Sequence, residues 1–303
     1  MKMKYLKLLS VLFFAVTLST CVHVAAITDV SAQVAGALGV IDQDTANAIS
    51  QSAQAIGRAA EEITPEQEYF LGRAVAANIL VSYRIWTGNP GLTMYLNRIC
   101  SAIAINSPRP YLYNGYHVNI LDTNEINAFA TPGGHIFITR GLIACADSED
   151  ALAAVIAHEL AHIQLQHGVK AIRNSRITQA VMITGTNAAG AAAGMNLVDL
   201  TNVFNESVNE IVSTMITSGY SQSQEFEADT TALALLAATG YDPSGLVMML
   251  RAIERASGSS SSGFGKTHPS PAQRIANVER GLNQYRVQDT RSYRQARYAT
   301  AVR

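Results

Sequence analysis

Residues 158–162 read His158-Glu159-Leu160-Ala161-His162, and this stretch decides the expected fold. On an α-helix, positions i and i+4 share one face, so both imidazoles can reach a single metal ion. Glu159 then lies beside the same ion, where a carboxylate can act as a general base. The alternative is a helix whose two histidines only pack or face solvent. The pattern itself favours a catalytic zinc bound on one helix.

The flanking residues predict a helix over about 148–167. Ser148 can cap its first turn, and Asp147 and Asp150 favour the positive end of the helix dipole. Gly168 stands where a helix stop is expected. Apolar residues recur between these ends at helical spacing, namely Leu152, Val155, Ile156, Leu160 and Ile163. This context favours metal binding over a chance match.

The composition is that of a folded protein. The chain has 303 residues, of which 48% are hydrophobic and 15% charged, and its formal net charge is −1. These values fit a globular core and exclude a disordered chain. The length admits one large domain or two small ones. The near-neutral charge and the lack of a recognisable phosphate-binding glycine loop give no reason to expect a nucleic-acid partner.

The N-terminal residues 1–21 indicate export. Three lysines precede an apolar run over residues 8–18, as in a secretory signal, and the run is too short for a membrane-spanning helix. Two processing sites remain open. Residues 18–21 are similar to a bacterial lipobox, which would place a lipid on Cys21, whereas Val24-Ala25-Ala26 offers an ordinary cleavage site.

Two cysteines remain once Cys21 is removed or acylated, and they are Cys100 and Cys145. In an oxidising compartment they could form a disulfide, and the alternative is two buried thiols. Both interpretations stay open.

The chain is expected to have four parts: the signal over 1–21, a linker and helix over 22–62, a main domain over 63–285 and a basic tail over 286–303. In the second part, a linker passes into an amphipathic helix near 43–60. The main domain begins with helices and continues into short strands before helices dominate again. The predicted helices are 65–85 and 90–105, and the predicted strands are 116–121, 126–130 and 135–139.

Three stretches allow alternative interpretations. Residues 177–198 carry no charge and are rich in Ala, Gly and Thr; a loosely packed helix or a flap over the active site is favoured over a membrane span. Residues 257–265 are nearly all Ser and Gly, which predicts a flexible loop. The tail over 286–303 is expected to be solvated or frayed, the alternative being contact with an anionic membrane.

A catalytic zinc usually takes three protein ligands and a water. Patterns with a third histidine six residues after the second do not apply, because that position is Gly168. His167 should be rotated well away from His162, and we expect it to pack or to cap the helix C-terminus. The third ligand must therefore lie elsewhere in the chain.

A helix from about Ser221 to Ala238 supplies the better candidate. Glu225 and Asp229 lie four residues apart and share a face, so Glu225 can bind the metal while Asp229 accepts a hydrogen bond from a ligand histidine. Glu227 is expected to point elsewhere. The alternative is an acidic first turn that only stabilises the helix.

Five sequence blocks, within about residues 63–280, resemble the HtpX-, LoiP- and BepA-type bacterial zinc metallopeptidases, whose relatives include the CaaX prenyl-protein proteases and the Oma-type proteases. These blocks are Asn127–Gly134, Ile138–Leu142, Ala157–His162, Glu225–Asp229 and Thr267–Ile275. The chain is similar to the compact, LoiP-like form, because it has no clear set of membrane spans and no room for a helical-repeat domain. The resemblance implies an α+β, mainly α fold: a zincin-like core with a small β-sheet edging the active-site cleft.

The resemblance also implies the roles of individual residues. One zinc ion per chain would be held by His158, His162 and Glu225, with Glu159 as the general base. His268 would gate the site or contact the transition state, the alternative being a surface histidine in a turn. An extended peptide would add as a strand beside residues 135–139, and the residues assigned to substrate binding are Gly134, His135, Ile136, Phe137 and Arg274.

The expected activity is zinc-dependent cleavage of unfolded or extended polypeptides in the bacterial periplasm, as protein quality control. A lipid on Cys21 would anchor the protein to the outer membrane. The rival function is a chaperone-like factor of the outer-membrane assembly machinery, with its zinc latched by His268 as a fourth ligand. A zinc-dependent esterase on the same core is a third interpretation.

Overall fold

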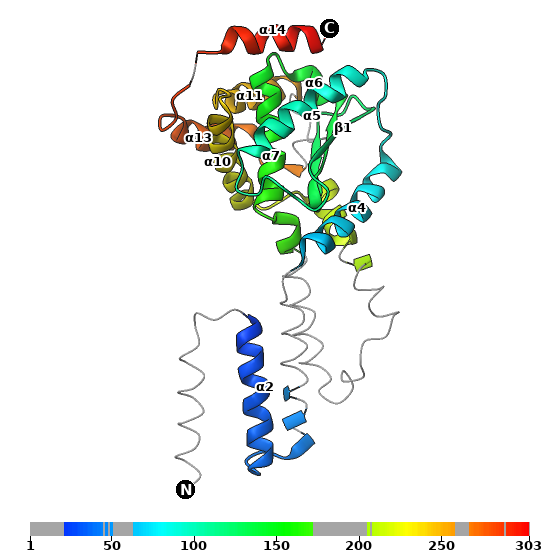
Figure 1. Ribbon diagram of the computed structural model, residues 1–303, viewed down its shortest axis with the longest axis vertical. Coiled ribbons are helices and arrows are strands. Elements are labelled where there is room, and N and C mark those ends of the chain that lie inside the picture. The colour runs from blue at the N-terminus through cyan, green and yellow to red at the C-terminus, as the bar shows by residue number, and fades with distance from the viewer. Residues whose placement is uncertain are drawn as a thin grey trace. The chain divides into compact units, whose positions relative to one another are not determined.

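The computed structural model describes residues 21–44, 46–47, 49–50, 63–171, 205–206, 208–257, 267–287 and 289–302. Contacts divide the chain into two units, and residues 64–170 and 202–303 form the unit that carries the zinc-binding pattern. Its elements appear in Figure 1. They are α4 (Pro65–Ser82), α5 (Pro90–Ile105), β1 (His117–Leu121), β2 (Ala128–Ala130), η1 (Pro132–Gly134), β3 (His135–Thr139), α6 (Arg140–Cys145), α7 (Glu149–Gln164), η2 (Thr214–Ser218), α10 (Gln222–Thr239), α11 (Gly245–Ser257), α13 (Pro271–Leu282) and α14 (Arg291–Ala301).

The three strands form a sheet with the order β1–β3–β2. β1 runs parallel to β3, with His117 opposite His135. β2 runs antiparallel to β3, with Phe129 opposite Phe137. The described chain is therefore mainly helical with one small mixed sheet, which confirms the predicted α+β, mainly α fold class.

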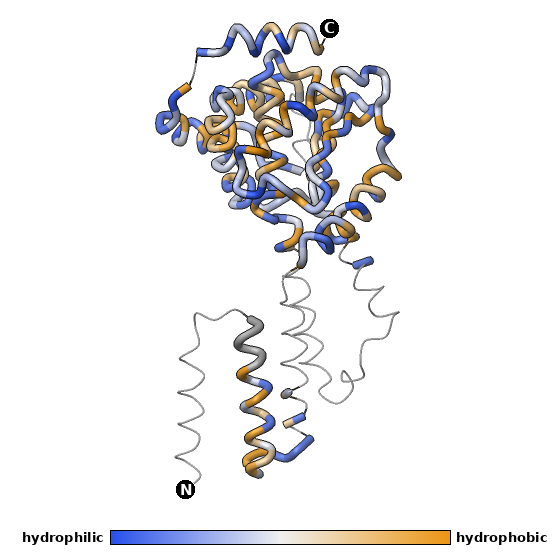
Figure 2. Tube along the Cα trace, viewed as in Figure 1, coloured by the Kyte–Doolittle hydropathy of each residue, from blue (hydrophilic) through white to orange (hydrophobic). Residues whose placement is uncertain are grey.

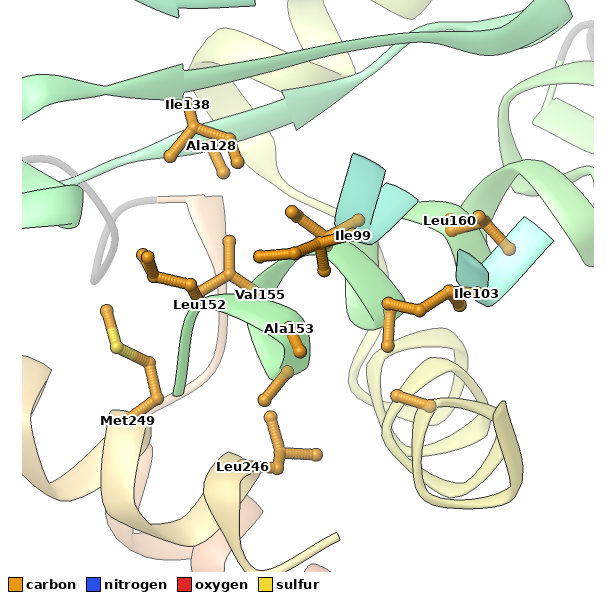
Figure 3. Packing of buried hydrophobic residues seen from close by; sticks show 14 of the residues in the cluster. Ile99, Ile103, Ala128, Ile138, Leu152, Ala153, Val155, Leu160, Leu246 and Met249 are labelled. Carbon is orange, nitrogen blue, oxygen red and sulfur yellow. The ribbon is translucent and has the colours of Figure 1, made fainter. Parts of the chain in front are cut away.

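α7 is the central helix of this unit. Ser148 caps it by accepting a hydrogen bond from the Ala151 N–H, and all residues from Glu149 to Ile163 are buried. In Figure 3 the helix, with Leu152, Ala153, Val155 and Leu160 labelled, lies between the sheet and α11, with α5 beside it. The labelled residues around it are Ala128 and Ile138 of the sheet, Leu246 and Met249 of α11, and Ile99 and Ile103 of α5. Helices apolar on all sides are typically buried in this way. The predicted metal ligands His158 and His162 are consequently held by packing on every side.

Helix starts and stops follow their local sequence signals. Thr64 and Gln67 form a reciprocal capping box at the start of α4. Ser221 and Gln224 do the same for α10, which ends at Gly240 in the left-handed conformation with φ 88°. Each capping pair satisfies backbone N–H groups that the first helical turn leaves unpaired. α10 packs along α7, so these caps also determine where the acidic residues of α10 begin.

The expected stop of α7 at Gly168 is wrong. The helix ends at Gln164 and is capped by Leu165. Gln166 follows with φ 55°, the single non-glycine residue at positive φ in the described part of the chain. This left-handed residue interrupts the helix two residues before the glycine.

The expected solvated or frayed tail is also wrong for residues 291–301, which form α14. Arg294 bonds to Asp150 at 2.8 Å, and Arg297 bonds to Glu149. Tyr298 donates a hydrogen bond to the Ala146 carbonyl at 2.6 Å. In Figure 2 hydrophilic residues of α14 alternate with pale and more hydrophobic ones, and its basic residues meet two buried carboxylates at the start of α7. These ion pairs dock the helix instead of leaving it in solvent.

The other unit contains α2 (Cys21–Ala37), which begins where a linker was expected. Gln33 of α2 donates a hydrogen bond to Ser50 at 3.2 Å, so the helix packs against the following helical residues. Residues 1–20, 177–198 and 258–265 lie outside the described residues, and with them the signal peptide, the possible flap and most of the Ser/Gly loop. Among the described helices, none is both long enough and apolar enough to cross a membrane.

Both cysteines of the main unit are free thiols. Cys100 is buried in the core, and its burial raises the pKa of the thiol to about 12. Cys145 is half-buried and donates a hydrogen bond to the Gly141 carbonyl at 3.3 Å. Of the two interpretations left open by the sequence, the structure has the reduced one.

Candidate metal centre

Three predicted ligands meet where α10 crosses α7. The Nε2 atoms of His158 and His162 lie 3.2 Å apart. Glu225 reaches them from α10, with Oε2 3.4 Å from His158 Nε2 and Oε1 3.5 Å from His162 Nε2. The i, i+4 spacing on one helix and a glutamate in the first turn of another therefore aim three donor atoms at one point.

His268 adds a fourth donor to the same point. Its Nδ1 lies 2.8 Å from Glu225 Oε2, and the donor atoms of all four residues lie within 4.8 Å of one another. All four side chains are buried, His268 being the most exposed at 8%. The cluster is consequently buried within this unit.

The geometry fits a tetrahedral zinc ion. Donors about 2.0–2.1 Å from zinc are separated from each other by about 3.3 Å along a tetrahedral edge. The two Nε2 atoms are 3.2 Å apart, and Glu225 offers a different oxygen to each ring, Oε2 at 3.4 Å from His158 and Oε1 at 3.5 Å from His162, so the separations are close to such an edge. Glu225 Oε1 is also buried without a hydrogen-bond partner, which is the state of a carboxylate oxygen prepared for a cation. Imidazole nitrogen and carboxylate oxygen are both donors that zinc accepts.

Asp229 and Arg274 orient His158 from behind. Asp229 Oδ1 lies 3.0 Å from His158 Nδ1, on the side of the ring away from the other donors. Arg274 donates two hydrogen bonds to Asp229, at 2.9 and 2.6 Å. Burial alone would raise the pKa of Asp229, but the Arg274 charge and the hydrogen bonds from His158 and Arg274 hold it well below its usual range. Asp229 is thus a carboxylate that can fix the tautomer of His158.

The two histidines of α7 respond differently to burial. Burial and the Arg274 charge disfavour protonation of His158, but hydrogen bonds with Asp229 and Glu225 raise its pKa to about 9. His162 lacks a direct carboxylate partner behind its ring, and burial lowers its pKa well below the usual value despite the nearby Glu225. Tyr220 stacks on the His162 ring, with centroids 4.4 Å apart and planes at 17°.

Glu159 lies beside the cluster and is buried. Burial raises the pKa of its carboxyl, against the opposing effect of His158 and His268. A raised pKa makes the carboxylate a better proton acceptor, which is the role of a general base.

His167 was expected to lie away from His162, and this expectation is wrong. The Nδ1 atoms of the two rings are 2.8 Å apart. On its other side, His167 Nε2 lies 3.3 Å from Glu227 Oε2, so Glu227 does not point away from the site region either. Burial lowers the pKa of His167. The left-handed turn at Gln166, which helical spacing alone could not reveal, brings His167 back toward α7.

The expectation that a peptide adds as a strand beside β3 is wrong, whereas the assignment of Gly134, His135, Ile136 and Phe137 to substrate binding stays a prediction. β3 is the middle strand and pairs on both sides, with β1 and with β2. Gly134, Ile136 and Phe137 are buried as well. A strand whose two edges are both paired has no N–H and C=O groups left for an added peptide. Residues 135–139 taken alone carry no sign that β3 has a partner strand on each side.

Arg274 is not on a cleft wall either. Its side chain is 1% exposed and is bound to Asp229, and its Nη1 lies 3.6 Å from Glu225 Oε2. A guanidinium paired with two buried carboxylates can hold both of them in position, and the assignment of Arg274 to substrate binding stays a prediction.

Comparison with known proteins agrees with this geometry. The sequence profile of Peptidase family M48 matches residues 90–281, a range that includes all four donor residues. The chain is 29% identical to mitochondrial metalloendopeptidase OMA1 of Schizosaccharomyces pombe, over 64% of this chain and 54% of that protein.

Two bacterial relatives give similar values. Identity to the beta-barrel assembly-enhancing protease of Escherichia coli O157:H7 is 28%, over 65% of this chain and 40% of the relative. Identity to metalloprotease LoiP of Escherichia coli K12 is 29%, over 54% and 63% respectively. The matched segments thus span between 40% and 63% of these three relatives. The chain belongs to Peptidase family M48.

Proposed function

We propose that this protein is a zinc-dependent endopeptidase that hydrolyses peptide bonds in unfolded or extended polypeptides. The observation that carries the proposal is the group of donor atoms from His158, His162 and Glu225, spaced 3.2–3.5 Å apart with the buried Glu159 beside them. Membership of a peptidase family supports the reaction class.

In this proposal His158, His162 and Glu225 hold one zinc ion per chain, and Asp229 and Arg274 keep His158 and Glu225 in position. When bound, zinc supplies Lewis-acid chemistry, since it lowers the pKa of water and polarises a carbonyl group. Three protein donors match the usual number at a catalytic zinc, which needs one open position.

Glu159 is the proposed proton carrier. Burial raises the pKa of its carboxyl, so it can accept a proton from the attacking water and pass it to the leaving amine. Its position next to His158 in the sequence keeps it within reach of the reacting atoms without making it a ligand.

We place the extended substrate along β2 and not along β3. Within the described residues β2 pairs as a strand only with β3, and on its other edge the Ala128 N–H donates to Asn127 Oδ1 at 3.0 Å. Because all three β2 residues are buried, this edge must be uncovered before a peptide can add. Thr267 donates a hydrogen bond at 3.3 Å to Asn127, the residue before β2, and the next residue is the donor His268. The start of this edge is therefore adjacent to the metal cluster. A peptide added there would form backbone hydrogen bonds with β2 whatever the amino-acid sequence of the peptide.

His268 is proposed to close the resting site. A zinc ion with four protein donors has no position left for water, so hydrolysis requires His268 to leave. This arrangement supports the second candidate function, a latched assembly factor with little proteolysis. Four relatives are named beta-barrel assembly-enhancing proteases, which makes outer-membrane assembly machinery a candidate partner.

The export-type pattern over residues 1–21 supports a periplasmic location with a role in protein quality control. Acylation of Cys21 would add an outer-membrane anchor. The lipoprotein and the ordinary cleavage product differ in mass, so mass spectrometry of the processed protein distinguishes them.

The proposal is tested with the full processed protein, wild type and Glu159→Gln, incubated with casein while bound zinc is measured. We expect stoichiometric zinc in both proteins and cleavage by wild type alone, with the variant at least about 100-fold slower because proton transfer is lost. A variant that still cleaves at the wild-type rate would remove Glu159 from this role, and a zinc-free wild type would refute the zinc proposal.

A further inference from the structure

His162 is held from behind by a chain of two side chains. His162 Nδ1 lies 2.8 Å from His167 Nδ1, and His167 Nε2 lies 3.3 Å from Glu227 Oε2. His162 and His167 are 2% and 1% exposed, whereas the Glu227 side chain is 52% exposed. The chain therefore runs from solvent through a buried imidazole to a buried metal-binding ring.

The hydrogens in this chain can be assigned from its chemistry. An ionised carboxylate only accepts hydrogen bonds, so the His167 nitrogen that faces Glu227 must carry the hydrogen. The neutral His167 ring then has an acceptor at Nδ1, and the facing His162 Nδ1 must donate. His162 Nε2 is left with a lone pair, and this is the atom that lies 3.2 Å from His158 Nε2 and 3.5 Å from Glu225 Oε1.

We propose that His167 and Glu227 are positioning residues that hold His162 in the tautomer and ring orientation needed to bind the metal. The inference rests on the proposed function, because it requires a metal at His162. It parallels the other ligand, since His158 is oriented by Asp229 directly, at 3.0 Å. α10 would then supply three acidic roles: Glu225 as ligand, Asp229 for one histidine, and Glu227 through His167 for the other.

Two further features support a positioning role over simple packing. The left-handed turn at Gln166 is needed, because five residues of continuous helix would rotate His167 by about 140° from His162. Tyr220 stacks on one face of the His162 ring, at 4.4 Å between centroids, and restricts its rotation. With the ring face held by Tyr220 and Nδ1 held by His167, the His162 ring has a single orientation toward the metal.

The test measures zinc affinity of the full processed protein by competition with a chromophoric chelator. His167→Phe keeps a ring but removes the acceptor, so zinc affinity should fall about 10- to 100-fold. His167→Asn restores an acceptor, because Asn Oδ1 takes the place of the imidazole Nδ1, and affinity should stay within about 3-fold of wild type. The cobalt-substituted proteins should show the same order: an altered visible spectrum for His167→Phe and a wild-type spectrum for His167→Asn.

Glu227 is tested through its dependence on His167. Glu227→Ala should weaken zinc binding by about 3- to 10-fold, less than the loss of His167 because its contact is longer and half-exposed. In the His167→Phe background the same change should have no further effect, because Glu227 acts only through His167. Glu279→Ala is the matched control, since it removes another half-exposed carboxylate, which pairs with Arg251 at 2.8 Å, and it should leave zinc affinity unchanged.

Equal affinity in wild type and His167→Phe would overturn the inference, and so would His167→Asn binding as weakly as His167→Phe. An equal effect of Glu227→Ala in both backgrounds would remove Glu227 from the chain. If His167→Phe does not fold, the comparison of His167→Asn and Glu227→Ala with wild type still decides between the outcomes. A wild-type protein that binds no zinc would refute the proposed function itself, which these results distinguish from failure of the positioning role.

Discussion

Replacing Arg294 by alanine is expected to destabilise the protein by about 3–5 kcal/mol, the cost of removing one partner from a buried ion pair. Arg294 and Asp150 are 3% and 4% exposed, and their charged atoms lie 2.8 Å apart. The variant would leave the Asp150 carboxylate buried, with the Asp242 N–H at 2.9 Å as a remaining donor. It would also remove the hydrogen bond from Arg294 to the Gly240 carbonyl, at 3.2 Å.

Two other arginines of α14 should cost less stability when replaced by alanine. Arg297 pairs with the buried Glu149, but its own side chain is 54% exposed, and Tyr95 also donates to Glu149 at 2.8 Å. Solvent screening and this second donor should limit the cost of Arg297→Ala to less than about 2 kcal/mol. Arg291→Ala, on the exposed first turn of α14, should change stability by less than about 0.5 kcal/mol.

Urea unfolding followed by circular dichroism measures these differences as shifts of the midpoint at constant slope. The Arg294→Ala midpoint should fall by more than about 1 M, given slopes of about 1–3 kcal/mol per molar urea. If the three variants unfold together with wild type, α14 is not docked on α7 by these pairs. A larger effect for Arg297→Ala than for Arg294→Ala would contradict the argument that burial sets the cost.

Other predictions concern the closed site and the thiols. His268→Ala should raise the rate of peptide hydrolysis because His268 blocks the open position; a lower rate would assign His268 to catalysis, and an unchanged rate would remove it from closure. Cys145 should be alkylated before Cys100 at pH 8. Burial raises the pKa of the Cys100 thiol to about 12, and it also raises the pKa of Cys145, whose side chain is less buried. Site-resolved mass spectrometry reads both, and a Cys100–Cys145 disulfide or faster labelling of Cys100 would contradict the free-thiol arrangement.

Several elements could be predicted from sequence because their signals are local. The helix over 90–105 and the strand over 135–139 have the predicted bounds. Asn89 and Pro90 start the helix, and Gly133 and Gly134, both at positive φ, turn the chain into the strand. Each signal acts within a few residues and does not depend on the rest of the fold. Likewise, the i, i+4 spacing of α7 was sufficient to bring two ligand nitrogens together.

Features set by distant partners could not be predicted. The order of the strands depends on pairings between segments, so the middle position of β3 has no signature within residues 135–139. The docking of α14 depends on Arg294 meeting Asp150, which is 144 residues away in the sequence. From sequence alone, a basic C-terminal segment is predicted to lie in solvent, because its buried acidic partners are not known. A buried carboxylate can only be recognised as such in the folded protein.

The contact between His162 and His167 could not be predicted from the sequence, for a different reason. Helical spacing places His167 on another face, and glutamine rarely adopts the left-handed conformation found at Gln166. A weak signal was available, because a third histidine close to the zinc-binding pattern can orient a ligand as well as bind metal.

X-ray absorption at the zinc edge of the purified wild-type protein tests the central claim most directly. The account predicts stoichiometric zinc with nitrogen and oxygen donors at about 2.0–2.1 Å, and an imidazole contribution that falls by one ring in His268→Ala. A sulfur donor at about 2.3 Å would contradict the assignment of this site. So would an imidazole contribution that stays the same in both His158→Ala and His162→Ala.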